Sequence, residues 1–268
     1  MNINRSSYLY WLKSGRENIE NTTKFYCLII QIYSESNGIY GSPKITAVLN
    51  RKGVSCSISK VAKAMHLIGI RSIVSKRFPH KKSSMTDKEK SLIINLIKGL
   101  DIVRLNQVWT TDVTYIQTVN EGTLYLITYI DYFSKKVVSW GLYYDQKADK
   151  LVNTLNMAIK KRKPLPGLIC HSDKGSQMRS NLYRNFLRDN NLVFSYTSLN
   201  HSCDENAAQE SFHSLIKKEK LYQMKLYNYE DAHRAIYNYI EGFYNPIRLH
   251  SSIGYLSPDE FEKSLKIN

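Results

Sequence analysis

The sequence has few cysteines and no long apolar run, and these two absences exclude whole classes of protein. Its four cysteines stand far apart with no C-x-x-C pair, so their spacing predicts neither a disulfide framework nor a cysteine-rich zinc site. No stretch approaches the roughly 18 consecutive apolar residues that a membrane span requires, and the N-terminus has no apolar signal core. We therefore expect a protein of the reducing cytoplasm with no membrane partner.

Acidic residues are also scarce relative to basic ones. The chain has 38 Lys and Arg residues against 23 Asp and Glu, which gives a formal net charge of +15. A field of this sign attracts polyanions, and nucleic acid is the first partner that it suggests. Net charge alone is almost equally compatible with an ordinary basic protein. A length of 268 residues leaves room for more than one domain.

Residues 1–75 are predicted to form a small helical module. Between Thr22 and Ile73 the apolar residues fall at helical spacing in three blocks separated by turn signals. One predicted helix has Ser42 as N-cap and Pro43 at its first position, and another begins near Ser57. Two such helices can present one helix to a DNA groove, although a hairpin that only packs on the core has the same spacing. In the DNA-binding interpretation, the candidate contacts of this module are Lys44, Lys60 and Lys63.

The composition changes twice after this module. Between Arg71 and Lys90 it shifts to Lys, Arg, Ser and His, and we assign residues 76–103 to a basic linker. Residues 104–268 are predicted to form an α/β core, because an antiparallel meander of three β-rich runs precedes alternating helices and strands. The predicted strands are Val108 to Gln117, Thr123 to Phe133, Lys136 to Tyr144, Leu168 to His171 and Leu192 to Tyr196. The predicted helices are Ala148 to Lys161, Leu182 to Arg188, Asn206 to Leu221 and Glu230 to Phe243.

Three carboxylates of this core lie at positions where a bound metal ion would account for an acidic residue. Asp112 lies inside an apolar β-run, where a charge is costly to bury unless it is paired or bound to a cation. Asp173 follows the apolar strand that ends near His171, and Glu210 lies within a predicted helix. Hard oxygen donors of this kind suit a magnesium or manganese site that leaves positions for water and phosphate.

A site with two ions, roughly 3.5–4 Å apart, could support an in-line phosphoryl displacement without a covalent protein nucleophile. Lys217 stands two helical turns after Glu210, on the same face, where it could meet a phosphate near the metals. Each acid taken alone is more often a salt-bridged or capping carboxylate. Spacing and context therefore suggest this site without establishing it.

The segments around these acids resemble the second reading-frame product of the IS3 family of bacterial insertion sequences, whose core is similar to that of retroviral integrases. Trp109 to Ile116 resembles the first-acid motif, and His171 to Gln177 resembles the second. The third motif is matched by Cys203, Asn206-Ala207, Glu210-Ser211-Phe212, Lys217 and Glu219. Further matches are Tyr40-Gly41 and the module to about Arg71, and near the C-terminus Tyr239-Ile240, Tyr244-Asn245, Arg248, His250-Ser251 and Ser257-Pro258.

The resemblance covers nearly the whole chain and implies an RNase H-like mixed sheet with flanking helices, preceded by a helix-turn-helix-like module. It implies an Asp-Asp-Glu triad of Asp112, Asp173 and Glu210 that binds two magnesium ions, for which manganese can substitute. It also implies transposition through DNA cleavage and strand transfer, a homo-oligomer on DNA, and a separate first-frame product that supplies another helix-turn-helix. Two rivals stay open: a metal nuclease on the same core that never joins DNA, and a DNA-binding regulator whose acids no longer bind metal.

The chain departs from the family's pattern near the third acid. The interval between Asp173 and Glu210 is one residue longer than usual, and the extra residue falls within Ser198 to Ser202. Met178 and Glu205 replace a more common tyrosine and aspartate. These changes put in doubt the details of DNA contact more than the type of reaction.

Several neighbouring residues have structural interpretations. We expect Trp109 to pack in the core, Asn206 to cap the third-acid helix, His171 to pack at the sheet edge and His213 to be half exposed. Arg248 is included among the candidate DNA contacts, although a structural hydrogen bond explains it equally well.

Overall fold

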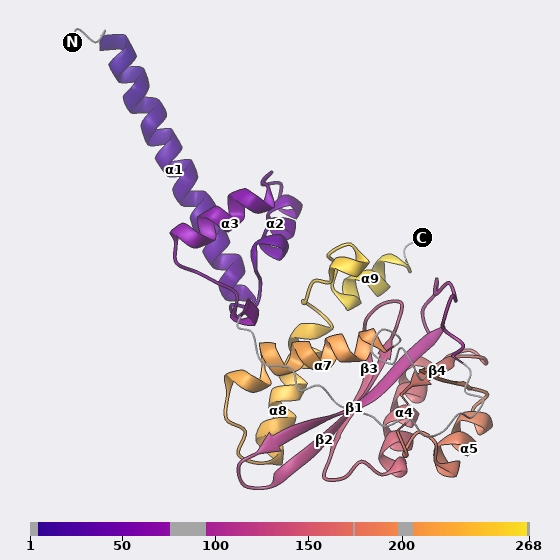
Figure 1. Cartoon of the computed structure of the whole chain (residues 1–268). Helices are drawn as coiled ribbons and strands as arrows, with labels where there is room; N and C mark the ends of the chain where they lie inside the picture. Colours follow the sequence, from indigo (N-terminus) through magenta and orange to yellow (C-terminus); the bar gives the residue numbers. More distant parts are fainter. Residues whose placement is uncertain (1–4, 76–94, 174, 198–205, 267–268) are drawn as a thin grey trace. The chain divides into compact units, whose positions relative to one another are not determined.

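The computed structural model describes residues 5–75, 95–173, 175–197 and 206–266, and the chain divides into two units, Met1–His80 and Lys81–Asn268 (Figure 1). The predictions for most of the linker, for the extra residue within Ser198 to Ser202 and for Cys203 and Glu205 lie outside the described residues. In the part of the chain that is described, no helix is long and apolar enough to cross a membrane.

Over residues 5–75, the N-terminal unit forms three helices and a short 3₁₀ turn. These are α1 (Arg5–Glu35), α2 (Ser42–Arg51), α3 (Ile58–Leu67) and η1 (Ile73–Ser75). The three helices bury a common set of aliphatic side chains, which includes Ile29, Ile32, Ile45, Leu49 and Val61. The predicted helical module is therefore confirmed.

Two details of this unit differ from the prediction. α1 begins at Arg5, well before Thr22, because the intervening sequence has no proline and only one glycine to interrupt a helix. The N-cap of α2 is Gly41 rather than Ser42, although Pro43 does lie in its first turn. α3 starts as expected, since the side chain of Ser57 accepts a hydrogen bond from the backbone N–H of Lys60.

The second unit is built on a mixed five-stranded sheet with the order β3-β2-β1-β4-β5. The first three strands form the predicted antiparallel meander, and the last two run parallel to β1. The strands are β1 (Val108–Thr118), β2 (Gly122–Asp131), β3 (Val137–Tyr143), β4 (Ile169–Ser172) and β5 (Val193–Tyr196). Their bounds differ from the predicted ones by at most two residues.

Helices cover both faces of this sheet (Figure 1). The predicted helices correspond to α4 (Ala148–Arg162), α5 (Asn181–Asp189), α7 (Ala207–Glu219) and α8 (Tyr229–Tyr239). α8 continues into a π-helical turn, η3 (Ile240–Tyr244). The remaining elements are η2 (Leu221–Gln223), η4 (Ser251–Ile253) and α9 (Pro258–Ser264), which a capping box at Ser257 begins.

The alternation of side chains along β1 separates the core from the site. Trp109 is fully buried, as expected, and packs with Tyr129 of β2 and with Leu151 and Leu155 of α4. Residues an odd number of positions from Trp109 point to the opposite face, where α7 lies. Asp112 is one of them, so it faces away from the hydrophobic cluster that contains Trp109 and toward α7.

Candidate active site

Asp112 and Asp173 are brought together by the register of two parallel strands. β1 and β4 pair over four residues, and the last pair is Thr111 with Ser172. Asp112 and Asp173 each follow directly, one step beyond that pair. Neighbouring positions on adjacent strands lie roughly 5 Å apart and point to the same face. Two acids that are far apart in the sequence therefore become neighbours at the C-terminal end of β4.

The position of Asp112 is open because the two strands differ in length. β4 ends at Ser172, whereas β1 continues to Thr118. The backbone N–H of Val113 donates to Oδ1 of Asp112 at 2.7 Å. The other carboxylate oxygen, Oδ2, lies 3.4 Å from Nδ1 of His213, and the Asp112 side chain keeps 24% of its surface exposed. The carboxylate is thus held from two sides and still reaches solvent.

Asp173 is partly buried as well, and its surroundings disfavour a negative charge. Burial raises the pKa of Asp173 above its ordinary value, and the nearby charge of Asp112 raises it further. The backbone N–H of Gly175, which donates to Oδ1 of Asp173 at 3.0 Å, acts in the opposite direction. The raised pKa of Asp173 thus reflects its burial and its repulsion by the carboxylate of Asp112.

The loop after Asp173 is tightly folded. A Cβ atom on Gly175 would lie 2.9 Å from the Gln177 side chain, 3.1 Å from the Met178 side chain and 3.2 Å from Oδ1 of Asp173, so a larger residue would require these side chains to shift. The hydroxyl of Tyr196 donates to the backbone carbonyl of Met178 at 2.9 Å. Met178, where a tyrosine is common in related sequences, is buried and contributes to the core cluster.

α7 is attached to the sheet beside the two aspartates. The Nε2 amide of Gln209 donates to the carbonyl oxygen of Thr110 at 2.6 Å and to that of Thr128 at 3.2 Å. Glu210 follows Gln209 in the first turn of α7 and is exposed. Asn206 occupies the predicted N-cap position, but its side chain makes no capping hydrogen bond.

The structure brings two of the three predicted acids together. Among the residues that it describes, no group of three His, Cys, Asp or Glu side chains is arranged to hold a metal ion, so Glu210 does not complete such a group with Asp112 and Asp173. The donors that are together suit a hard cation, because carboxylate oxygens are its preferred ligands and mutual repulsion favours a positive charge between them.

Lys217 lies close to Asp112, as its place on the helix predicts. Burial lowers the pKa of Lys217, and the charge of Asp112 partly offsets this effect. Its side chain is half buried. Lys217 is thus a cationic residue of α7 that lies near Asp112.

Three functional candidates were not predicted from the sequence: Gln209, His213 and Thr128. His213 is buried, with 8% of its surface exposed, which corrects the expectation of a half-exposed residue. Gln209 and His213 are four residues apart, and this spacing places both on the face of α7 that meets the sheet. The signal available in the sequence was the presence of two polar residues four positions apart in a predicted helix. The sequence does not show which strand these residues meet.

Arg248, a candidate DNA contact in the sequence, is paired with Glu219 inside the core unit. Its guanidinium donates to both carboxylate oxygens of Glu219, at 2.8 Å and 2.7 Å, and only 5% of the residue is exposed. The hydroxyl of Tyr239 donates to the same carboxylate at 2.7 Å. Because Arg248 is buried in this network, its role is the structural hydrogen bond that the sequence left open.

The candidate DNA contacts of the N-terminal unit lie on α2 and α3. Lys60 and Lys63 are exposed, and the ammonium of Lys60 lies 4.8 Å from the ring centroid of Phe25. Lys44 is half buried, 5.1 Å from the ring centroid of Tyr40. The two α3 lysines are therefore more accessible to a phosphate than Lys44.

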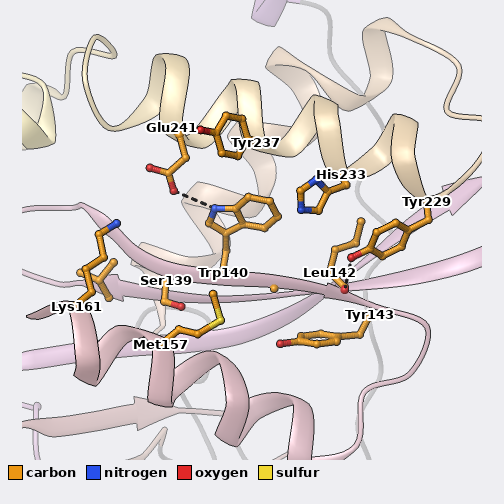
Figure 2. A pocket seen from close by; sticks show the side chains of 12 residues that line it. Ser139, Trp140, Leu142, Tyr143, Met157, Lys161, Tyr229, His233, Tyr237 and Glu241 are labelled. Carbon is orange, nitrogen blue, oxygen red and sulfur yellow. Dashed lines mark hydrogen bonds between the residues drawn. The ribbon is translucent and has the colours of Figure 1, made fainter.

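A cavity of the core unit lies along the edge strand β3 (Figure 2). This cavity of about 490 Å³ is lined by β3, α4 and α8, with Trp140, Tyr143, His233 and Tyr237 among its aromatic residues. The indole N–H of Trp140 donates to Glu241 at 3.1 Å. Of the described residues that line the cavity, none belongs to the predicted site, so the acids and this cavity are separate features.

Comparison with known proteins decides the family. An integrase core domain model matches residues 103–202, a second integrase core domain model matches residues 195–258, and an HTH-like domain model matches residues 22–78. The transposase for insertion sequence element IS904 of Lactococcus lactis is 37% identical, over 87% of this chain and 90% of that protein. The chain belongs to the IS3 family of insertion-sequence transposases.

The transposase InsF for insertion sequence IS3A of Escherichia coli is similar over an even larger part of the chain. It is 30% identical over 98% of this chain and 91% of that protein. As an IS3-family transposase with an integrase core, the chain is a polynucleotidyl transferase that acts on DNA in transposition. The integrase core models span all three predicted acids, and the HTH-like model spans the lysines of α2 and α3.

Solved structures with a similar arrangement include viral integrases and another transposase. The HTLV-2 integrase catalytic core domain in complex with magnesium is 16% identical, with a TM-score of 0.45, over 58% of this chain and 95% of that chain. The catalytic domain of Mos1 mariner transposase is 17% identical, with a TM-score of 0.45, over 60% of this chain and 82% of that chain. Another structure of that domain is described with manganese.

Proposed function

We propose that Asp112, Asp173 and Glu210 of this transposase hold magnesium, or manganese in its place, and form the centre that cuts and rejoins DNA. The observation that carries this proposal is the register of β1 and β4, which sets Asp112 and Asp173 side by side. Two carboxylates in a half-buried place repel each other, and the raised pKa of Asp173 reflects this cost. A bound cation would remove the repulsion.

Glu210 is proposed as the third acid because of its place on α7. Its neighbour Gln209 is hydrogen-bonded to β1, the strand that carries Asp112, and to β2 beside it, and the Glu210 side chain is exposed. Two ions are expected. When bound, they would polarise the attacking oxygen and stabilise the leaving oxygen of an in-line displacement.

The reaction is proposed in two steps that need no covalent protein intermediate. In the first, a water oxygen bonds to the phosphorus at the element's end, and the bond from that phosphorus to the 3′-oxygen breaks to leave a 3′-hydroxyl. In the second, this 3′-hydroxyl bonds to a target phosphorus and displaces the target's own 3′-oxygen, which takes up a proton. Each step forms one P–O bond and breaks one, so no external energy source is required.

The remaining proposed contacts are electrostatic. Lys217 would bind a phosphate beside Asp112, and Lys44, Lys60 and Lys63 would contact the DNA backbone from the N-terminal unit. We also propose that at least two copies assemble on paired ends, with a first-frame product as an additional DNA-binding partner. Sedimentation of the chain with terminal DNA, in the presence and absence of that product, measures both.

The test of the catalytic proposal uses the element's terminal DNA as donor and a supercoiled plasmid as target, with magnesium. Wild type is compared with Asp173→Asn, and DNA binding by both is measured separately. Joined products from the wild type alone are the expected result. Cleavage without joining would favour a metal nuclease, and DNA binding without either activity would favour a regulator or a missing first-frame partner.

A further inference from the structure

A series of polar contacts, some of them hydrogen bonds, links Asp112 to the interior of the core unit through α7. It starts at the amide of Gln209, whose Nε2 donates to the carbonyl oxygens of Thr110 and Thr128. Because the NH₂ group of this amide is committed to two carbonyls, its Oε1 is left as an acceptor. The hydroxyl of Thr128 donates to that oxygen at 2.8 Å. The orientation of the amide is therefore set by its surroundings.

His213 continues this series to the acid. Its Nε2 lies 3.4 Å from Oγ1 of Thr128, and its Nδ1 lies 3.4 Å from Oδ2 of Asp112. An ionised carboxylate has no hydrogen to give, so this contact favours the form of the ring that carries a hydrogen on Nδ1. The one hydrogen of the Thr128 hydroxyl goes to Gln209, so the approach of His213 Nε2 to Thr128 packs the buried ring against β2 without a hydrogen donated by the threonine.

Each oxygen of the Asp112 carboxylate consequently has a nitrogen beside it. Val113 N–H is at Oδ1, and the imidazole is at Oδ2. A carboxylate offers about four lone-pair sites, so two such neighbours leave lone pairs on both oxygens for a cation. They also fix the plane of the group, which would otherwise turn about its own Cβ–Cγ bond at the open edge of β1.

We propose that His213 is a positioning residue of the metal site: it orients the Asp112 carboxylate and couples it to the register of α7, the helix that carries Glu210. This inference rests on the proposed function of Asp112 as a ligand. α7 presents Gln209 and His213 to the sheet, while Glu210 lies one residue after Gln209 in the same helical turn. Through these contacts, a single helix sets the placement of the first acid and carries the third.

The test compares His213→Phe with His213→Gln. Phenylalanine has a similar ring without a donor, whereas glutamine retains an N–H that can reach a carboxylate. Manganese binding to the whole chain is measured by calorimetry, and the magnesium dependence of cleavage is measured separately. His213→Phe is expected to raise the half-saturating metal concentration about 10-fold in both measurements, because partners of metal ligands typically contribute 10- to 100-fold to affinity. His213→Gln is expected to restore most of that loss.

A matched control is His233→Phe, the same change at an exposed histidine of α8 that stacks on Tyr229 outside the site. It should leave the metal titration unchanged. Thermal unfolding and DNA binding of each variant show whether the fold is intact, and His213→Ala takes the place of His213→Phe if the latter does not fold.

Asp112→Asn separates the two ways in which the inference could fail. Loss of metal binding in Asp112→Asn, together with a wild-type titration for His213→Phe, would overturn the positioning role and leave the proposed metal site standing. Wild-type manganese binding by Asp112→Asn would overturn the proposed site itself, and the positioning role with it.

Discussion

The core unit holds two kinds of acid, and the contrast between them separates stability from function. Glu219 is buried and receives two hydrogen bonds from Arg248, so its charge is matched inside the protein. Asp112 and Asp173 instead face each other at the open end of β4. A matched buried pair holds a fold together, whereas adjacent carboxylates retain an unfavourable charge that a ligand can relieve.

The same contrast appears at a second matched pair. Arg162 of α4 donates to both oxygens of Glu262 in α9, at 2.6 Å and 2.7 Å, and Ser134 donates to Glu262 as well. Burial by itself would raise the pKa of Glu262, but the hydrogen bond and charge of Arg162 outweigh it and leave the pKa lowered. The pKa of Asp173 is shifted in the opposite direction, so the two kinds of acid can be told apart by titration.

The largest expected effect is on catalysis. Asp173→Asn should reduce cleavage and joining by about 10³-fold or more, because an amide is a poor substitute for an anionic metal ligand. The same change should leave the free energy of unfolding equal or slightly higher in the absence of metal, since it removes a repelled charge. Product assays and denaturant unfolding in a chelator measure the two effects. Retained cleavage would remove Asp173 from the site.

The next effect is on stability. Arg248→Met leaves the buried carboxylate of Glu219 unpaired and should lower the free energy of unfolding by about 3–5 kcal/mol. Replacing both partners, Arg248→Met with Glu219→Leu, should recover a large part of this loss, because neither buried charge then remains. Denaturant titrations of the single and double variants measure this. If Arg248 contacted DNA instead, the folded single variant would show a smaller salt dependence of DNA binding.

A smaller effect distinguishes the two kinds of acid by their pH dependence. Because the folded-state pKa of Glu262 is lowered, its contribution is present above its ordinary value of 4.5 and is lost as the pH falls through the lowered pKa. Glu262→Gln should therefore cost about 1–3 kcal/mol at neutral pH and much less in acid. For Asp173 the pKa is raised, so any gain from Asp173→Asn should appear at neutral pH and vanish in acid. Unfolding at several pH values, with a chelator present, tests both signs.

The smallest effect concerns the cation beside the acids. Lys217→Ala should weaken DNA binding severalfold and reduce the slope of log affinity against log salt by about one, because one phosphate contact is lost. Binding of terminal DNA at several salt concentrations measures that slope. A slope equal to that of the wild type would show that Lys217 makes no phosphate contact and acts only on Asp112.

Much of this architecture could be predicted, because its signals are local. β-branched and aromatic runs marked the five strands to within one or two residues, and helical periodicity located α4, α5, α7 and α8. Acids inside or just after apolar strands were singled out from the sequence as candidates for a metal site. The early start of α1 was missed because the apolar spacing becomes regular only later in that helix.

Two residues whose surroundings could not be predicted depend on contacts between distant segments. His213 and Arg248 have no local feature that distinguishes a buried polar residue from an exposed one. Their roles follow from partners, Asp112 and Glu219, that lie on other elements.

The sequence by itself determined the order of the elements, the family and the identity of the candidate acids, since each depends on residue types and their spacing along the chain. Tertiary structure alone decided which acids meet and which are neutralised. The register of β1 with β4 sets Asp112 beside Asp173, while the packing of α7 places His213 against Asp112 and Glu219 against Arg248. The physical reason is that the energy of a carboxylate depends on its neighbours in space, which determine whether it is paired with a cation, repelled by another anion or accessible to a ligand.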